Sequence, residues 1–236
     1  MINLLANENA LVLASGGMDS TVSLYWALRR FKQVDVISFD YNQKHKIELD
    51  VIKNICLDLS LSHKIVDLSF IKDILISNLF IGKDDVNEKH KLDANLPSSF
   101  VPYRNMLFLT VAAGYASTIG AQNLVIGVCE TDYSGYADCR DVFIKACQVA
   151  LNLSTDFEGK NLEIHTPLMR LTKSDEFRLA EELGCLDVVL LKTMTCYNGV
   201  ETMRSYGKGC GACPACILRK NGYDGYISGK SKINIS

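Results

Sequence analysis

The chain has 236 residues, of which 48% are hydrophobic and 22% are charged, a balance that is typical of globular proteins and unlike disordered or fibrous ones. Its formal net charge is −2 without a long basic run, which argues against a dedicated nucleic-acid binder and favours a small-molecule substrate. No stretch reaches the roughly 18 to 20 consecutive apolar residues of a membrane span, and the first residues lack the basic segment of a secretory signal. We therefore expect a cytoplasmic protein without a membrane or nucleic-acid partner.

Short apolar runs alternate with amphipathic segments along most of the chain. The runs predict strands at residues 10–14, 34–40, 63–68, 123–128 and 161–168. The amphipathic segments predict helices at residues 19–31, 52–59, 105–120, 142–153 and 173–184. This alternation predicts an α/β fold with a doubly wound, mostly parallel five-stranded sheet that helices cover on both faces.

Four loops that follow predicted strands carry most of the polar motifs. They contain SGGMDS, DYNQKH, GVCETDYSGYADCR and TPLMRLTKSD. Because ligands of such sheets bind beyond the carboxyl ends of the strands, we expect these loops to converge on one cleft.

Two other segments differ in composition from the rest of the chain. Residues 82–96 are charged and poor in apolar residues, and they form either a solvated surface loop or a mobile lid. After residue 192 the chain becomes rich in glycine and cysteine. We therefore expect an α/β domain at residues 1–192 and a small subdomain at residues 193–236, for which the motifs described next indicate nucleotide binding and metal binding, respectively.

The segment SGGMDS joins the first predicted strand to the first predicted helix. Glycines at such a turn leave backbone N–H groups uncovered at the positive end of a helix dipole, where phosphate oxygens can approach closely. The lysine of the G-x-x-x-x-G-K-[ST] phosphate loop is missing. Asp19 could orient a loop amide or help to hold Mg²⁺. Alternatively, Asp19 or Ser20 only caps the helix.

Four cysteines have the spacing of a metal site. Cys196 is followed by CGACPAC, which places Cys210, Cys213 and Cys216 in consecutive C-x-x-C steps. This spacing predicts a tetrahedral Cys₄ zinc site, with a redox C-x-x-C as the alternative. Because four thiolates leave no position for a water, we expect the metal to organise the C-terminal segment and not to catalyse. The remaining thiols are expected to be packed at Cys56, Cys147 and Cys185, while Cys129 has no assigned role.

The motifs resemble a known family when they are taken together. SGGMDS resembles the loop S-G-G-x-D-S of the PP-loop ATP pyrophosphatase superfamily, whose members transfer AMP from ATP to an acid or amide oxygen. With the other loops, VPYRNMLFL at residues 101–109 and the four cysteines, the chain resembles the 7-cyano-7-deazaguanine synthase (QueC) family over essentially its whole length. The usual family motifs are close to D-Y-G-Q-x-H, V-P-G-R-N and D-Y-S-G-Y-P-D-C-R, so Asn42, Tyr103 and Ala137 depart from them.

The resemblance implies a homodimeric ligase of the queuosine precursor pathway that uses ATP, Mg²⁺ and Zn²⁺. It would convert 7-carboxy-7-deazaguanine and ammonia to 7-cyano-7-deazaguanine through adenylated acid and amide intermediates. The residues expected to bind ATP are Ala14, Ser15, Gly16, Gly17, Met18, Asp19, Ser20, Thr21, Val22, Ser23 and Leu24. Those expected to act on the reacting groups are Asp19, Lys44, His45, Arg104 and Lys173. Those expected to recognise the base are Tyr133, Tyr136, Asp138 and Arg140.

Several alternatives stay open at this point. The tyrosines could belong to the core while Asp138 and Arg140 pair with each other, and Cys139 could be a nucleophile, although no partner base is evident. His45 could accept a proton from ammonium or be merely hydrogen-bonded. For the whole protein, the alternatives are a related adenylating enzyme that transfers a deazaguanine to another amine, and a non-catalytic zinc ribbon that binds nucleic acid.

Overall fold

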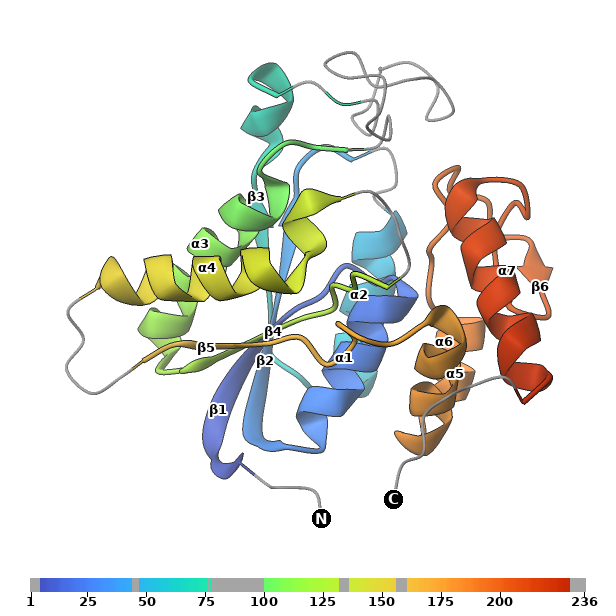
Figure 1. Cartoon of the computed structure of the whole chain (residues 1–236), viewed down its shortest axis with the longest axis horizontal. Coiled ribbons are helices and arrows are strands. Elements are labelled where there is room, and N and C mark those ends of the chain that lie inside the picture. Colours follow the sequence, from blue (N-terminus) through green and yellow to red (C-terminus); the bar gives the residue numbers. More distant parts are fainter. Residues whose placement is uncertain are drawn as a thin grey trace.

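The computed structural model describes residues 5–43, 47–75, 77, 100–131, 136–155 and 161–229. Its five-stranded sheet has the order β3-β2-β1-β4-β5, and all neighbouring strands are parallel (Figure 1). The strands are β1 (Leu5–Leu13), β2 (Phe31–Asp40), β3 (His63–Asp67), β4 (Asn123–Ile126) and β5 (Glu163–His165). Because the chain winds outward from β1 in both directions, the switch point of the sheet lies between β1 and β4.

Seven α-helices and two short 3₁₀ segments are present in the described part of the chain. The helices are α1 (Met18–Leu28), α2 (Ile47–Asp58), α3 (Arg104–Ile119), α4 (Asp141–Leu153), α5 (Lys173–Glu182), α6 (Leu186–Leu191) and α7 (Pro214–Ile227). The 3₁₀ segments are η1 (Ser69–Asp73) and η2 (Ala137–Cys139), and a small hairpin is formed by β6 (Met203–Arg204) and β7 (Gly207–Lys208). The predicted doubly wound α/β fold is therefore confirmed.

The two faces of the sheet are covered by different helices, because successive side chains of a strand point in opposite directions. Leu11 and Leu13 of β1 are buried in a cluster with residues of α3 and α4. Ala10 and Val12 of the same strand are buried in a second cluster with residues of α1 and α2. The central strand is thus apolar on both faces, as its continuous hydrophobic run predicts.

The C-terminal segment packs against the α/β layers through α5, α6 and α7, which lie together beside α1 (Figure 1). Phe177 of α5 is fully buried, and its ring contacts Tyr223 and Tyr226 of α7 at centroid distances of 5.3 and 6.0 Å. Met18, the first residue of α1, belongs to the same hydrophobic cluster. Helix α7 therefore shares a hydrophobic cluster with the first residue of α1.

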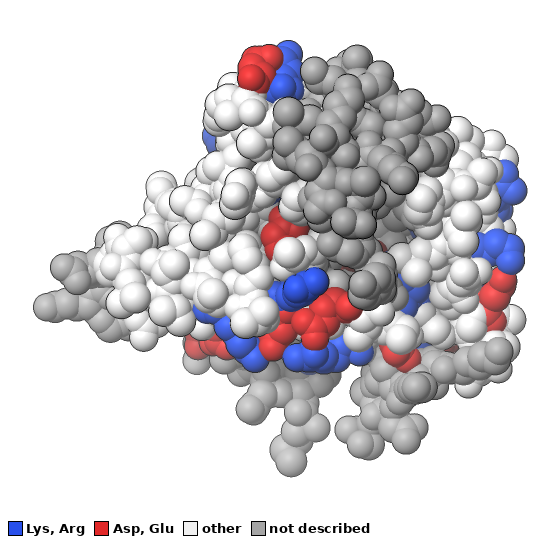
Figure 2. Space-filling model, turned by 45° about the horizontal axis from the view of Figure 1, so that its top comes forward, with Lys and Arg blue, Asp and Glu red and all other residues white. Residues whose placement is uncertain are grey.

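The described surface carries charges of both signs. On the face drawn in Figure 2, Lys and Arg are interspersed with Asp and Glu instead of gathering in one basic patch. Among the helices that the structure describes, none combines the length and the hydropathy needed to cross a bilayer.

Candidate active site

The loop between β1 and α1 has a conformation that only glycine permits at one position. Gly16 has φ +94°, and a Cβ atom placed there would lie 2.2 Å from the backbone oxygen of Glu48 at the start of α2. Gly17 is the N-cap of α1 and contributes no side-chain cap. The first amide groups of a helix have no intrahelical acceptor, so this loop presents N–H groups at the positive end of the α1 dipole.

Hydroxyl groups within the loop fix its shape. The Ser15 amide donates to Ser20 Oγ at 3.1 Å, and Ser20 Oγ donates to the Gly17 carbonyl at 3.2 Å. Thr21 Oγ1 donates to the same carbonyl at 2.8 Å. The interpretation in which Asp19 or Ser20 caps α1 is therefore wrong, because Gly17 holds the N-cap position and Ser20 closes the loop instead.

The predicted nucleotide-binding segment divides into an accessible part and a core part. Ser15 is exposed, while Gly17 and Asp19 are half-buried at the rim of the loop. The side chains buried within the fold are those of Ala14, Met18, Ser20, Thr21, Val22, Ser23 and Leu24. Their contribution to a ligand would thus come from the backbone, which is how glycine-rich loops hold phosphates.

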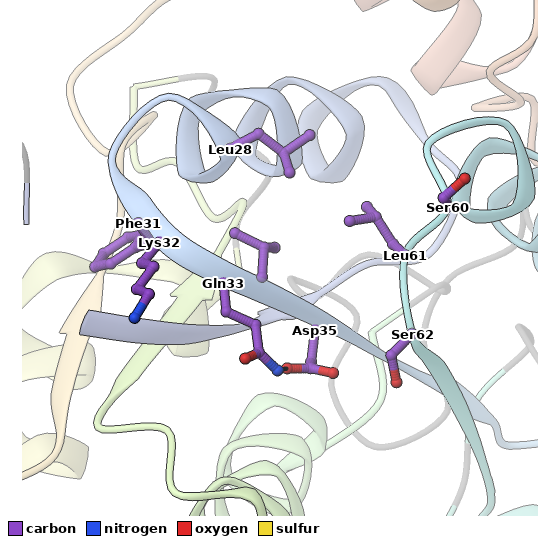
Figure 3. Close-up of a pocket in the computed structure, with 9 residues that line it drawn as sticks. Leu28, Phe31, Lys32, Gln33, Asp35, Ser60, Leu61 and Ser62 are labelled. Atoms are coloured by element: carbon purple, nitrogen blue, oxygen red, sulfur yellow. Dashed lines mark hydrogen bonds between the residues drawn. The ribbon is translucent and has the colours of Figure 1, made fainter. Parts of the chain in front are cut away.

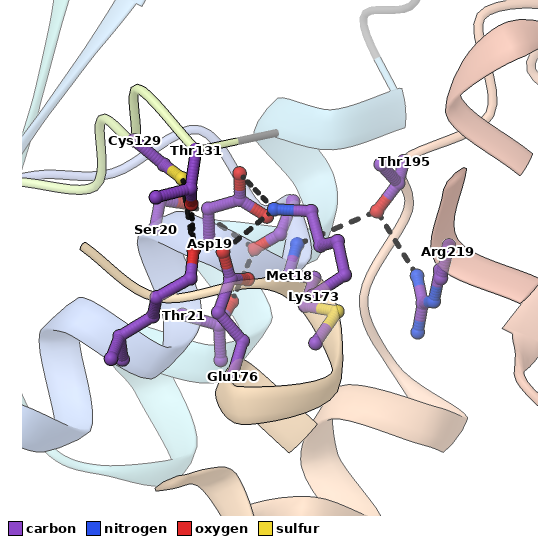
Figure 4. Close-up of polar contacts among 12 residues, drawn as sticks. Met18, Asp19, Ser20, Thr21, Cys129, Thr131, Lys173, Glu176, Thr195 and Arg219 are labelled. Atoms are coloured by element: carbon purple, nitrogen blue, oxygen red, sulfur yellow. Dashed lines mark hydrogen bonds and ion pairs between the residues drawn. The ribbon is translucent and has the colours of Figure 1, made fainter. Parts of the chain in front are cut away.

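Two predicted site residues from distant parts of the chain meet beside the loop (Figure 4). Lys173 Nζ lies 2.8 Å from Asp19 Oδ2 and 2.7 Å from Glu176 Oε1, and the lysine side chain is only 8% exposed. Lys173 is held there because α5 begins with a capping box, in which Thr172 and Asp175 satisfy each other's backbone amides. The arrangement fixes one ammonium charge at the mouth of the loop.

A second cationic group lies at the start of α3. Tyr41, at the end of β2, is hydrogen-bonded to the Arg104 side chain. The Arg104 guanidinium lies 5.9 Å from the ring centroid of Tyr136. Burial lowers the pKa of Arg104, but the neighbouring Tyr41 and Asp138 raise it by a larger amount. The pKa therefore lies above its ordinary value. Arg104 is thus a permanently charged centre among residues of three loops.

Asp138 presents a buried carboxylate oxygen toward this cluster. Its Oδ2 accepts a hydrogen bond from the backbone N–H of Asn105 at 3.2 Å, whereas its Oδ1 has no hydrogen-bond partner among the described residues. Arg140 is exposed at the N-cap of α4, and the described contacts include no ion pair between it and Asp138. The alternative in which these two residues pair with each other is therefore wrong. A buried acceptor without a partner is instead suited to an N–H group of a ligand.

The neighbouring Cys139 is poorly suited to nucleophilic attack. Burial raises the pKa of its thiol to about 11, and Asn105 Nδ2 lies 3.5 Å from its sulfur. The thiolate and not the thiol is the nucleophile, and a raised pKa keeps Cys139 protonated at neutral pH. Cys139 is therefore unsuited to act as a covalent nucleophile.

Two side chains of the cluster were not expected from the sequence. Glu48 follows the DYNQKH motif by three residues, and burial raises the pKa of its carboxyl to about 8, with Arg104 lowering it and Asp19 raising it. Tyr197 directly follows Cys196, is hydrogen-bonded to Tyr136, and has a pKa raised above its ordinary value chiefly by burial. Proximity to a recognised motif is the only sequence signal that either residue carries.

The four cysteines form a compact cluster. The sulfur atoms of Cys196, Cys210, Cys213 and Cys216 all lie within 4.8 Å of one another, and those of Cys210 and Cys216 are 3.9 Å apart. Four sulfurs at the Zn–S distance from a tetrahedral centre are about 3.8 Å apart, so the donor set fits zinc. Burial raises the pKa of Cys210, but the amides of Ala212 and Cys213 outweigh it and bring the pKa to about 6.

Three predicted site residues lie outside the described residues, namely Lys44, His45 and Tyr133, as does the segment at residues 82–96. The predicted packed thiols Cys56, Cys147 and Cys185 are buried, as expected.

A separate hollow of about 430 Å³ lies at the opposite end of the sheet (Figure 3). It is bordered by the end of α1, the start of β2 and the turn before β3. Gln33 and Asp35, which are hydrogen-bonded at 3.0 Å, belong to its wall. None of the predicted site residues lines it.

Comparison with known proteins supports the predicted fold. The family described as queuosine biosynthesis protein QueC matches residues 9–227. The chain is similar to a 4-thiouridine synthetase in complex with RNA and ATP, with a TM-score of 0.50 and 18% identity over 94% of this chain and 52% of that one. It is also similar to the U34-tRNA thiolase NcsA from Methanococcus maripaludis, with a TM-score of 0.47 and 17% identity over 96% of this chain and 67% of that one. The likeness to the thiouridine synthetase concerns the fold alone, and the chain spans about half of that protein.

Proposed function

Because the chain belongs to the QueC family of queuosine biosynthesis proteins, we propose that it is an ATP-dependent carbon–nitrogen ligase that makes 7-cyano-7-deazaguanine from 7-carboxy-7-deazaguanine and ammonia. The observation that carries the proposal within the molecule is the meeting of Asp19, Lys173 and the glycine loop beside the cluster of Arg104 and Asp138. A glycine loop with free helix amides, next to a cation and a buried carboxylate oxygen that has no partner among the described residues, suits adenylation of a base-like acid.

In the first half of the reaction, the substrate carboxylate attacks the α-phosphorus of ATP and pyrophosphate leaves. We infer that the loop at residues 15–20 holds the leaving pyrophosphate through its backbone amides. The ammonium of Lys173, which pairs with Asp19 at 2.8 Å, would compensate charge that develops on the phosphates. The Asp19 carboxylate could also help to hold a Mg²⁺ ion, which would neutralise negative charge on the phosphates.

The second half of the reaction uses the same groups again. Ammonia displaces AMP to give an amide, and a second ATP activates the amide oxygen, whose loss as AMP leaves the nitrile. Both adenylates are sensitive to water, so the buried position of Asp138 beside Arg104 suits this chemistry. One loop would thus serve two rounds of ATP cleavage.

Recognition of the deazaguanine would fall to the cluster around Asp138. Its buried Oδ1 could accept hydrogen bonds from the N–H edge of the base, and the ring of Tyr136 could stack on the base. Arg104 would attract the substrate carboxylate. A zinc ion held by the four cysteines would be structural, because the closed thiolate set leaves no position for a water.

The test is a product assay with purified protein, ATP, Mg²⁺, ammonium and the 7-carboxy compound. The expected result by mass spectrometry is the nitrile together with AMP, two AMP for each nitrile. Release of ADP in place of AMP, or the absence of both the nitrile and AMP, would reject the proposal. AMP release without nitrile, together with a mass adduct on an added amine, would favour the related enzyme that transfers a deazaguanine to another acceptor.

A further inference from the structure

Arg219 is a buried cation that the proposed reaction does not use. It lies in α7 with 1% of its surface exposed, the largest side chain that is fully buried in the described part of the chain. Its Nε donates to the Tyr206 carbonyl at 2.7 Å and its Nη2 to the Val189 carbonyl at 2.7 Å. Gly207 makes room for it, since a Cβ atom there would lie 2.3 Å from the guanidinium. The guanidinium is therefore held in one position by these contacts.

The third contact of Arg219 leads to the nucleotide loop (Figure 4). Its Nη1 donates to Thr195 Oγ1 at 3.0 Å, and the same oxygen accepts a hydrogen bond from the Met18 amide at 3.5 Å. One residue earlier, the Met194 amide donates to the Gly16 carbonyl at 3.1 Å. The segment before Cys196 thus contacts the residues on either side of Gly17, namely Gly16 and Met18.

We propose that Arg219 is a positioning residue for nucleotide binding, acting through Thr195 to hold residues 16–18 in the conformation that presents the α1 amides after Met18 to phosphate. The Thr195 hydroxyl links Arg219 to the loop, because its oxygen accepts hydrogen bonds from both the guanidinium and the Met18 amide. A loop that is already fixed loses less entropy when it binds phosphate. The inference rests on the proposed function only in naming ATP as the ligand.

Substitution of Thr195 tests the contact directly. Thr195→Val keeps the shape and removes the hydroxyl, whereas Thr195→Ser keeps the hydroxyl. The probe is α,β-methylene-ATP with Mg²⁺, titrated calorimetrically into the zinc-loaded full chain. We expect Thr195→Val to bind the probe about fivefold more weakly, which is the effect of one lost hydrogen bond, and Thr195→Ser to restore binding. Unchanged binding by Thr195→Val would overturn the proposal.

A double-mutant cycle tests whether Arg219 acts through Thr195. Arg219→Lys keeps the charge but cannot reach all three acceptors, so it should weaken probe binding in the wild-type background and have little effect in Thr195→Val. Equal weakening in both backgrounds would overturn the assigned route. If Arg219→Lys does not fold, the comparison of Val with Ser at position 195 still decides.

Arg204 provides the matched control within the same segment. Its side chain donates to the carbonyls of Gly209 and Cys210 at 2.9 and 2.8 Å and has no described contact with the nucleotide loop. Arg204→Lys should therefore leave probe binding unchanged. In steady-state assays, a positioning role raises KM for ATP, whereas loss of folded protein lowers only kcat. A wild-type chain that binds the probe but makes no nitrile would reject the proposed function and leave this inference standing.

Discussion

Two residues in loops at the site adopt a backbone conformation that usually requires glycine. Asn42 has φ +61° and Tyr103 has φ +60°, and both stand where the usual family motifs have glycine. Asparagine tolerates the left-handed region comparatively well, whereas a tyrosine there is strained by its Cβ atom. The departures from the motifs therefore change the side chain while the loop geometry that glycine would favour is kept.

Tyr103→Gly is expected to stabilise the protein. Tyr103 is 77% exposed, so its side chain contributes little packing, and relief of the left-handed strain should raise the free energy of unfolding by about 1 kcal/mol. For a chain of this size, this corresponds to a rise in the unfolding temperature of about 2–4 °C. Tyr103→Ala is the control, because it keeps the Cβ atom. An alanine variant as stable as the glycine variant would contradict the explanation.

Glu48 predicts a pH dependence of stability in the nucleotide-free protein. Its pKa is raised from 4.5 to about 8, chiefly by burial, so the folded state keeps a proton that the unfolded state releases. The unfolded state therefore binds fewer protons, and stability should fall as the pH rises from 5 to 8. Glu48→Gln should remove this slope and be the more stable protein at pH 8.

Denaturant titrations of both proteins at several pH values measure the effect. Asp50→Asn serves as the control, because Asp50 is exposed on the same turn of α2 and its replacement should leave the slope in place. A wild-type slope that Glu48→Gln does not change would show that another group is responsible.

At the scale of elements, the glycine loop and α2 fit together without space for a side chain. Gly16→Ala would bring a Cβ atom to 2.2 Å from the Glu48 carbonyl, in addition to the left-handed strain of about 1–2 kcal/mol. We expect a loss of stability larger than that strain, together with loss of binding of α,β-methylene-ATP. Gly120→Ala carries a similar strain at φ +72°, but its Cβ atom would have no neighbour within 4 Å. The difference between the unfolding temperatures of the two variants therefore measures the effect of the steric clash at Gly16. Equal losses would contradict this account.

The elements that periodicity predicted are those with long apolar faces. The helix at 105–120 and the strand at 34–40 agree with α3 and β2 to within a few residues, because α3 buries one face of a long helix that ends at Gly120 and β2 contains a short run that is buried on both faces. The sequence did not predict α7, which contains Gly222 and Gly225. A Cβ atom at Gly222 would lie 2.4 Å from Lys173 Cβ, so its glycine permits close contact with α5. Glycine lowers the stability of an isolated helix, but here it allows α7 to pack closely against α5. The local sequence pattern of α7 does not reveal this contact.

At the scale of the whole molecule, the motifs can be read from the sequence, whereas the contacts between them cannot. Asp19 and Lys173 were identified singly, but their ion pair joins positions separated by 154 residues. Thr195 and Arg219 carry no motif of their own and gain a role only because the C-terminal segment folds back onto the loop. The sequence therefore indicated the chemistry of the site, while its connection to the cysteine cluster required the tertiary structure.

Loss of the metal is expected to affect both stability and nucleotide binding, because Cys196 directly follows the segment that contacts the loop. Metal analysis should find about one zinc per chain, since the four thiolates form one tetrahedral set. Cys213→Ser removes one ligand and should abolish stoichiometric zinc, lower the unfolding temperature by about 5 °C or more, and weaken binding of α,β-methylene-ATP. Cys129→Ser, which lies outside the cluster, should keep the zinc. Iron in the freshly purified protein, or full zinc content in Cys213→Ser, would contradict the assignment.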